Sequence, residues 1–134
     1  MRVAPPTLHL SVPVHDLHAT RQFYEEVLGC RIGRVRDDWL DVWFFGLQLT
    51  LQERPDEVRP VTEQGVRHFG VVLGDREEFA RTVERVRTAG CEWISEPELH
   101  AADELSGKLS GKLADPSGNV IELKYYDDPA AFLG

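Results

Sequence analysis

The sequence has little cysteine, few basic residues and no long hydrophobic run. Two cysteines in 134 residues cannot form a disulfide framework, so we expect a reduced, cytoplasmic protein. Lys and Arg number 15 against 23 Asp and Glu, a net charge of -8. We therefore expect no nucleic-acid or membrane partner, because phosphates and anionic lipids bind clustered basic residues. No apolar run approaches the roughly 20 residues of a membrane span, and we expect no signal peptide.

The sequence does contain an internal repeat. The segment His9-Leu-Ser-Val-Pro-Val-His-Asp16 is similar to His68-Phe-Gly-Val-Val-Leu-Gly-Asp75, which lies 59 residues further along the chain. Each segment predicts a strand followed by an Asp that caps a helix. The length and an apolar content of 42% are typical of one globular domain, so the two halves are expected to form a single domain, 1–134.

Both halves continue with the same order of elements. Helical periodicity follows each Asp and ends at a Gly-Cys pair, as expected for a helix stop. Three strand signals then follow in each half. The predicted helices are 17–28 and 76–89, and the later strands are 30–35, 39–44, 47–52, 92–95, 108–114 and 119–126. The pattern predicts an α+β fold of two tandem βαβββ modules, about 7–52 and 66–126, joined by a linker at 53–65.

Alternation along the strands predicts where the chemistry lies. His9, Gln48, His68 and Glu122 fall on the faces opposite the apolar side chains. Each first strand carries a His at the same point of the repeat, and we expect Gln48 and Glu122 to be equivalent in the last strands. Two imidazoles and a carboxylate with open positions are typical of non-haem Fe(II) oxygenases, whereas extra oxygen ligands also suit Zn, Mn or Ni. A solvated face of an antiparallel sheet would show the same alternation.

Two longer motifs carry a family resemblance. Leu8-His9-Leu10-Ser-Val-Pro-Val-His-Asp16-Leu17, followed by Phe23-Tyr24-Glu-Glu-Val-Leu28-Gly29, resembles the opening of the vicinal oxygen chelate superfamily. Asp115-Pro116-Ser-Gly118-Asn119-Val-Ile-Glu122-Leu123 resembles its closing signature. That superfamily includes glyoxalase I, extradiol dioxygenases and bleomycin- and fosfomycin-resistance proteins. The chain is most similar to its small predicted extradiol-dioxygenase-like members.

The resemblance implies a fold and a metal site. It implies a curved mixed-sheet cup with helices on its outer face, and a homodimer. It also implies that His9, His68 and Glu122 bind a divalent metal ion, with Fe(II) favoured. Gln48 falls where glyoxalase I enzymes place a ligand Glu, so an additional oxygen ligand is expected there.

The implied activity is an extradiol-type dioxygenase acting on a small catechol-like or other vicinal-oxygen substrate. Two alternatives remain open: a glyoxalase-like isomerase or lyase, and a resistance protein that binds an antibiotic without chemistry. Candidate general bases are Tyr126, which shares the face of Glu122, and His100. The residues expected to line the substrate cup are Ser11, Trp43, Thr50, Gln52 and Lys124.

Overall fold

The structure is a computed structural model that describes residues 3–98 and 107–134. It divides into two compact units, Met1–Val58 and Arg59–Gly134. The boundary lies inside the segment 53–65, which was expected to be the linker. This segment holds two short 3-10 helices, η2 (Pro55–Glu57) and η3 (Val61–Glu63), that the sequence pattern did not predict.

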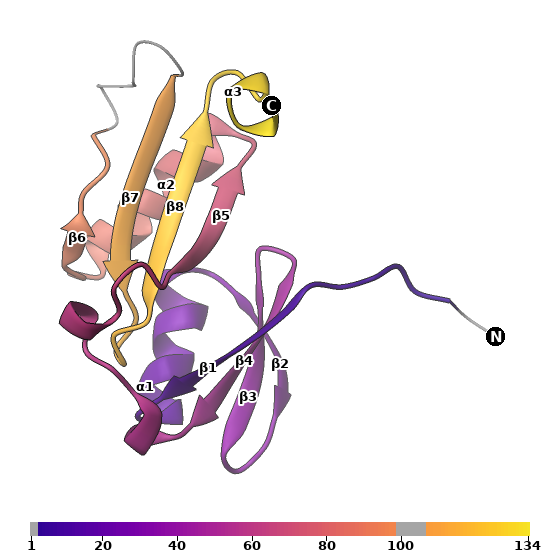
Figure 1. The fold of residues 1–134 in the computed structure, drawn as a ribbon, viewed down its shortest axis with the longest axis vertical. Coiled ribbons are helices and arrows are strands. Elements are labelled where there is room, and N and C mark those ends of the chain that lie inside the picture. Colours follow the sequence, from indigo (N-terminus) through magenta and orange to yellow (C-terminus); the bar gives the residue numbers. More distant parts are fainter. Residues whose placement is uncertain (1–2, 99–106) are drawn as a thin grey trace. The chain divides into compact units, whose positions relative to one another are not determined.

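The first unit contains a four-stranded sheet and a short helix. In chain order its elements are β1 (His9–Val14), α1 (Leu17–Gln22), η1 (Phe23–Val27), β2 (Arg31–Val35), β3 (Trp39–Phe44) and β4 (Leu47–Glu53). The spatial order of the strands is β1-β4-β3-β2 (Figure 1). β1 pairs with β4 in parallel, and the other pairs are antiparallel.

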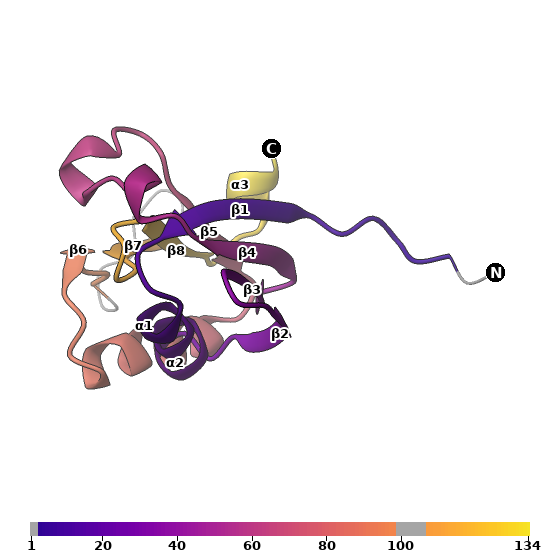
Figure 2. The same ribbon diagram turned by 90° about the horizontal axis from the view of Figure 1, so that it is seen from below.

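The second unit repeats this topology. Its elements are β5 (Phe69–Leu73), α2 (Arg76–Thr88), β6 (Trp93–Ser95), β7 (Lys108–Ala114), β8 (Val120–Tyr126) and a terminal helix α3 (Ala130–Leu133). The strand order is β5-β8-β7-β6, again with one parallel pair, and α2 lies across one face of this sheet (Figure 2). The predicted α+β class and tandem βαβββ order are confirmed, and the cup shape stays a prediction.

Helix boundaries follow the capping signals. The carboxylates of Asp16 and Asp75 accept hydrogen bonds from backbone N–H groups of the first turns of α1 and α2. Gly29 and Gly90 end the helices with φ of 72° and 74°, a left-handed conformation that favours glycine.

The first predicted helix is wrong in one respect. The segment 17–28 is not a continuous α-helix but changes to a π-helix at Phe23. The N–H of Leu28 donates to the carbonyl of Phe23, five residues earlier, at 3.2 Å. The wider turn lets two consecutive aromatic residues enter the core, because Phe23 is 6% exposed and Tyr24 is fully buried.

The apolar faces of the central strands form the cores. Leu49 and Leu51 of β4 are fully buried, as are Ile121 and Leu123 of β8. The ring of Tyr125 lies 6.3 Å from that of Phe79 in α2, so the odd-numbered face of β8 packs on this helix. The face that carries Glu122 is therefore the one away from α2.

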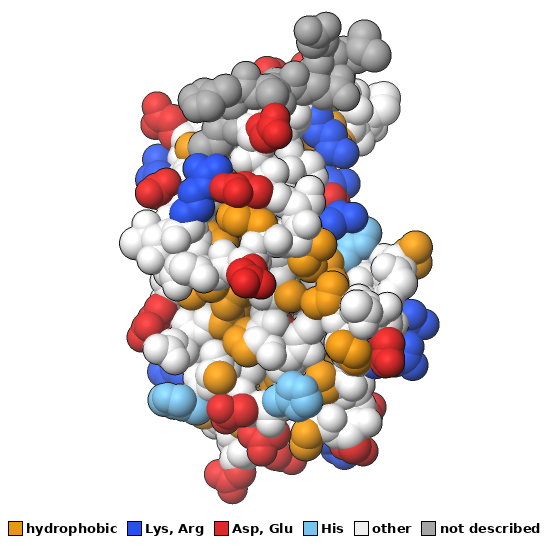
Figure 3. All heavy atoms as spheres, turned by 90° about the vertical axis from the view of Figure 1, so that its left-hand side faces the viewer, with side chains coloured by type: hydrophobic (Ala, Val, Ile, Leu, Met, Phe, Trp, Pro, Cys, Tyr) orange, Lys and Arg blue, Asp and Glu red, His pale blue; other side chains and the backbone are white. Residues whose placement is uncertain are grey.

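Leu8 continues the alternation of apolar residues in β1, but it is 77% exposed, because it precedes the first residue of that strand. The surface drawn in Figure 3 shows acidic and basic side chains interspersed. In the described part of the chain, no helix is long and apolar enough to cross a membrane.

Candidate metal centre

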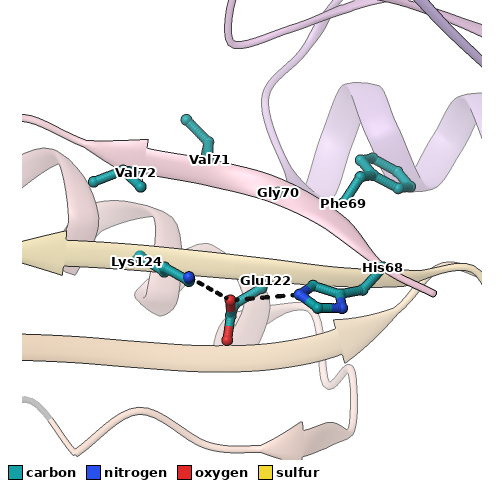
Figure 4. Close-up of a pocket in the computed structure, with 7 residues that line it drawn as sticks. All are labelled: His68, Phe69, Gly70, Val71, Val72, Glu122 and Lys124. Carbon is teal, nitrogen blue, oxygen red and sulfur yellow. Dashed lines mark ion pairs between the residues drawn. The ribbon is translucent and has the colours of Figure 1, made fainter. Parts of the chain in front are cut away.

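His68 and Glu122 face each other in the second unit. Nδ1 of His68 lies 2.8 Å from the carbonyl oxygen of Val66, to which it donates because a carbonyl only accepts. In the neutral ring this hydrogen bond leaves the lone pair on Nε2, which faces Oε1 of Glu122 at 3.7 Å (Figure 4). A histidine that donates one ring N–H to a backbone carbonyl keeps the other nitrogen for a metal ion, as metal-ligating histidines do.

β5 packs closely against β8 at the position of Glu122. Gly70 of β5 lies directly opposite Glu122 of β8. A Cβ atom at position 70 would overlap the backbone carbonyl of Glu122, so only glycine fits there. The hollow beside this contact has a volume of about 230 Å³ and is lined by His68, Phe69, Gly70, Val71, Val72, Glu122 and Lys124.

The Glu122 carboxylate is held by several groups. It is 8% exposed, accepts a hydrogen bond from Oγ of Ser110 at 3.0 Å, and lies 3.1 Å from Nζ of Lys124. Burial raises its pKa, but the hydrogen bonds from Lys124 and Ser110 and the charges of Lys124 and Lys112 outweigh burial, so the net pKa is lowered. The group is therefore an anion at neutral pH, ready to bind a cation.

His9 is anchored in a similar way in the first unit. It lies directly opposite Gln48, and its Nδ1 donates to the backbone carbonyl of Gln48 at 3.2 Å. This hydrogen bond again leaves Nε2 as the nitrogen with the lone pair. Both histidines are thus held through Nδ1 by a backbone carbonyl.

Strand register corrects one expected equivalence. Ser11, two residues after His9, lies opposite Thr50, whereas Gly70, two residues after His68, lies opposite Glu122. The counterpart of Glu122 is therefore Thr50, and the expected equivalence of Gln48 and Glu122 is wrong by two residues. Spacing along the chain could not reveal this shift, because a slip of two residues preserves the strand face.

The described residues contain no group of three His, Cys, Asp or Glu side chains that could hold a metal ion. His68 and Glu122 come together in the second unit, and His9 lies in the first. A nitrogen and an ionised carboxylate are suitable donors for Fe(II), Zn, Mn or Ni, so the residues present fit a divalent metal. The complete ligand set, with His9 and with Gln48 as an additional ligand, stays a prediction.

The residues expected to line a substrate cup fall on the predicted faces. Nε2 of Gln52 donates to Oγ of Ser11 at 2.6 Å. Both side chains line a polar hollow of about 330 Å³, together with Val12, Pro13, Arg54 and Glu57. Trp43 lies under the Arg31 guanidinium, 5.4 Å from its carbon, and Lys124 lines the hollow beside His68. Their role in substrate binding stays a prediction.

The candidate general bases are less well placed. Tyr126 lies four residues beyond Glu122 on β8, roughly 13 Å along the strand. Its ring stacks on Phe132 of α3 at 5.0 Å. The structure therefore does not bring Tyr126 next to Glu122. His100 lies outside the described residues.

Sequence reasoning missed Asp41 and Arg34. Asp41 is only 1% exposed on the Trp-bearing side of β3. Its carboxylate accepts hydrogen bonds from Oγ1 of Thr50 at 2.6 Å and from Nε of Arg34 at 2.7 Å. The available signal was an acidic residue in the middle of an otherwise apolar strand.

Comparisons with known proteins identify the family. A family model described as the Glyoxalase/Bleomycin resistance protein/Dioxygenase superfamily matches residues 7–123. An uncharacterized protein of Pseudomonas aeruginosa is 26% identical and aligns over 92% of this chain and 90% of its own length.

Two solved structures are also similar. A glyoxalase/bleomycin resistance protein/dioxygenase from Alicyclobacillus acidocaldarius is 28% identical, with a TM-score of 0.83 over 98% of this chain and 99% of that one. The fosfomycin resistance protein FosX of Listeria monocytogenes is 17% identical, with a TM-score of 0.70 over 98% of each chain, a likeness of fold alone. The chain belongs to the Glyoxalase/Bleomycin resistance protein/Dioxygenase superfamily.

Proposed function

We propose that the chain is a divalent-metal-dependent enzyme, an extradiol-type dioxygenase that uses Fe(II) and acts on a catechol-like substrate. The observation that carries the proposal is the pairing of His68 with Glu122, an anchored imidazole facing an ionised carboxylate. With His9 as the third ligand, the donor set is two histidines and one carboxylate, the set that non-haem Fe(II) oxygenases use. In the overall reaction a ring bond beside the diol breaks and both oxygen atoms of O₂ enter the product.

The bound metal would supply Lewis acidity and a meeting point for the substrate oxygens and O₂. The residues around it have separate tasks. His68 and Glu122 bind, and Ser110 holds Oε2 of Glu122 so that Oε1 faces His68. Lys124 keeps a positive charge in the same hollow, where its Nζ is placed to donate to a deprotonated hydroxyl of the diol.

Thr50, the residue opposite Ser11, favours the dioxygenase over a glyoxalase-like isomerase. The counterpart of Glu122 in the first unit is Thr50, whose hydroxyl donates to Asp41. An isomerase must abstract a proton from carbon; a threonine at this point supplies no base, so Glu122 would have to serve as both metal ligand and base. A resistance protein that binds an antibiotic without chemistry has no need of the anchored His68 and ionised Glu122.

Oxygen uptake tests the proposal. Protein purified without oxygen and loaded with Fe(II) is mixed with a panel of catechols. The expected result is oxygen consumption together with the absorbance of a ring-cleaved product. Turnover of a hemithioacetal without oxygen uptake would instead support the isomerase, and tight metal-independent binding of an antibiotic would support the resistance protein. Either result would overturn the proposal.

A further inference from the structure

A bulge in β2 turns Arg34 toward the face of the sheet that carries His9. β2 pairs with β3 through Arg31↔Trp43 and Ile32↔Val42, and then through Val35↔Leu40. Three steps along β2 thus match two steps along β3, so β2 holds one extra residue. In a regular strand Arg34 would share the side of Ile32, whose partner Val42 is buried in the core. The extra residue re-aims the side chain, as bulges near functional sites do.

The neighbouring glycine leaves room for this arrangement. A Cβ atom at position 33 would lie 3.2 Å from Cβ of Asp41 and 3.3 Å from Nε1 of Trp43. Gly33 therefore lets β2 lie close against β3 and keeps Arg34 near the Asp41 carboxylate. The bulge and Gly33 together place the Arg34 side chain beside Asp41.

The buried carboxylate of Asp41 fixes the guanidinium. Nε of Arg34 lies 2.7 Å from Oδ2 of Asp41, whose other oxygen accepts from Thr50. The Asp41 side chain is 2% exposed, whereas that of Arg34 is 58% exposed. A buried carboxylate without a partner loses its hydration, so Asp41 strongly favours the contact with Arg34. The contact therefore holds the guanidinium in one orientation before a ligand binds.

The outer edge of Arg34 stays available for a ligand. Its guanidinium carbon lies 5.0 Å from the ring of Trp39, in cation–π contact. Within residues 3–98 and 107–134, Arg34 is hydrogen-bonded through Nε alone, so its two terminal nitrogens can bind both oxygens of a carboxylate. By contrast, Nη1 of the nearby Arg36 donates to the carbonyl of Val35.

Register places this arginine within reach of a small molecule at His9. His9, Gln48 and Trp43 lie in one row across β1, β4 and β3, and Ser11, Thr50 and Asp41 lie in the next row on the same face. Asp41 is two strands and two residues from His9, a separation of roughly 12 Å between backbone positions. A ligand that spans this separation with the help of the two side chains needs only one aromatic ring and an acidic substituent.

We propose that Arg34 determines specificity by binding the carboxylate of an anionic aromatic diol whose hydroxyls lie toward His9, an inference that rests on the proposed function. The net charge of -8 gives no general attraction for anions, so a local arginine must provide it. Trp43 lies in the row of His9, with the Arg31 guanidinium over its ring.

Heteronuclear NMR of the metal-free, full-length protein tests this site. The probes are protocatechuate, a catechol that carries a carboxylate, and its neutral amide. The Nε–H signal of Arg34 is expected to shift on titration with protocatechuate, and the acid to bind about tenfold more tightly than the amide. Added salt should weaken this preference.

Matched variants separate a ligand-binding role from a structural one. Arg34→Gln should remove the preference for the acid, whereas Arg36→Gln, which changes a second arginine over Trp39, should retain it. Arg34→Lys keeps a positive charge beside Asp41 and serves if the glutamine variant does not fold. It should lose most of the preference for the acid, because an ammonium group cannot bind both carboxylate oxygens as the planar guanidinium does. Equal binding of acid and amide, an unmoved Arg34 signal, or an unchanged preference in either Arg34 variant would overturn the inference.

The experiments distinguish failure of the dioxygenase proposal from failure of the anion site. If the Fe(II)-loaded protein consumes no oxygen but the Arg34 signal shifts with the acid alone, the dioxygenase proposal fails and the anion site stands. If catechols are cleaved while acid and amide bind equally, the anion site fails and the dioxygenase stands.

Discussion

Nζ of Lys124 lies 3.1 Å from Oε1 of Glu122, the same carboxylate oxygen that faces Nε2 of His68 at 3.7 Å. One oxygen thus serves an internal cation and the candidate metal position. A metal ion at His68 would compete with Lys124 for it. The carboxylate stays ionised in either case, since its pKa is lowered by Lys124 and Ser110 despite burial.

Replacing Lys124 tests this competition. Lys124→Met should bind a divalent metal about tenfold more tightly at neutral pH, because the ammonium that competes for Oε1 of Glu122 is gone. Titration calorimetry with Mn(II) or Zn(II) measures the change. Lys108→Met is the control, since Lys108 lies opposite Tyr126 at the far end of β8. Weaker binding in the Lys124 variant would mean that the ammonium supports the site.

Acid should remove a contribution of Glu122 to stability. Its folded pKa is lowered from an ordinary value of 4.5, so the ionised form stabilises the fold at higher pH. The contribution is complete above this ordinary value and is lost as the pH falls through the lower folded value. Urea unfolding of the wild type and Glu122→Gln should differ most near neutral pH and converge in acid. A difference that grows in acid would contradict the lowered pKa.

The close approach of β5 and β8 predicts a large effect of one methyl group. Gly70→Ala should destabilise the protein by more than about 2 kcal/mol, because the new Cβ overlaps the Glu122 carbonyl. Gly74→Ala is the matched control, since no atom lies within 4 Å of its added Cβ. It should change stability by less than about 1 kcal/mol. Equal effects in thermal unfolding would show that the strands can move apart.

Thr50→Val should destabilise the protein, because the buried carboxylate of Asp41 loses a hydrogen bond. The change removes the hydrogen bond from Oγ1 to Oδ1 and keeps the shape of the side chain, so a loss of about 1–3 kcal/mol is expected. Denaturant unfolding measures this loss. Thr82→Val in α2 is a comparison, since its hydroxyl donates to a backbone carbonyl of the same helix rather than to a carboxylate. A smaller loss of unfolding free energy for Thr50→Val than for Thr82→Val would show that the buried carboxylate of Asp41 does not depend on Thr50.

Most of the fold could be predicted from the sequence, because caps, helix stops and strand alternation act locally. Asp16, Asp75, Gly29 and Gly90 each mark a boundary that the structure confirms. The superfamily resemblance is confirmed as well. The change to a π-helix at Phe23 was not predictable, since it depends on how the core accepts two adjacent rings.

The candidate site was harder to predict because it depends on register and on bulges. Alternation put His68 and Glu122 on the side of the sheet opposite the apolar side chains, where the structure brings them together. It could not separate Gln48 from Thr50 as the counterpart of Glu122, because both share one strand face. It missed Arg34, since the extra residue in β2 reverses the side on which Arg34 lies.

We propose that His9, His68 and Glu122 are the ligands of a catalytic metal ion. Elemental analysis of protein purified without oxygen tests it most directly, with His9→Ala, His68→Ala and Glu122→Ala beside the wild type. We expect about one iron per wild-type chain and its loss in each variant. Metal bound equally by wild type and all three variants, or no divalent metal bound by the wild type, would contradict it.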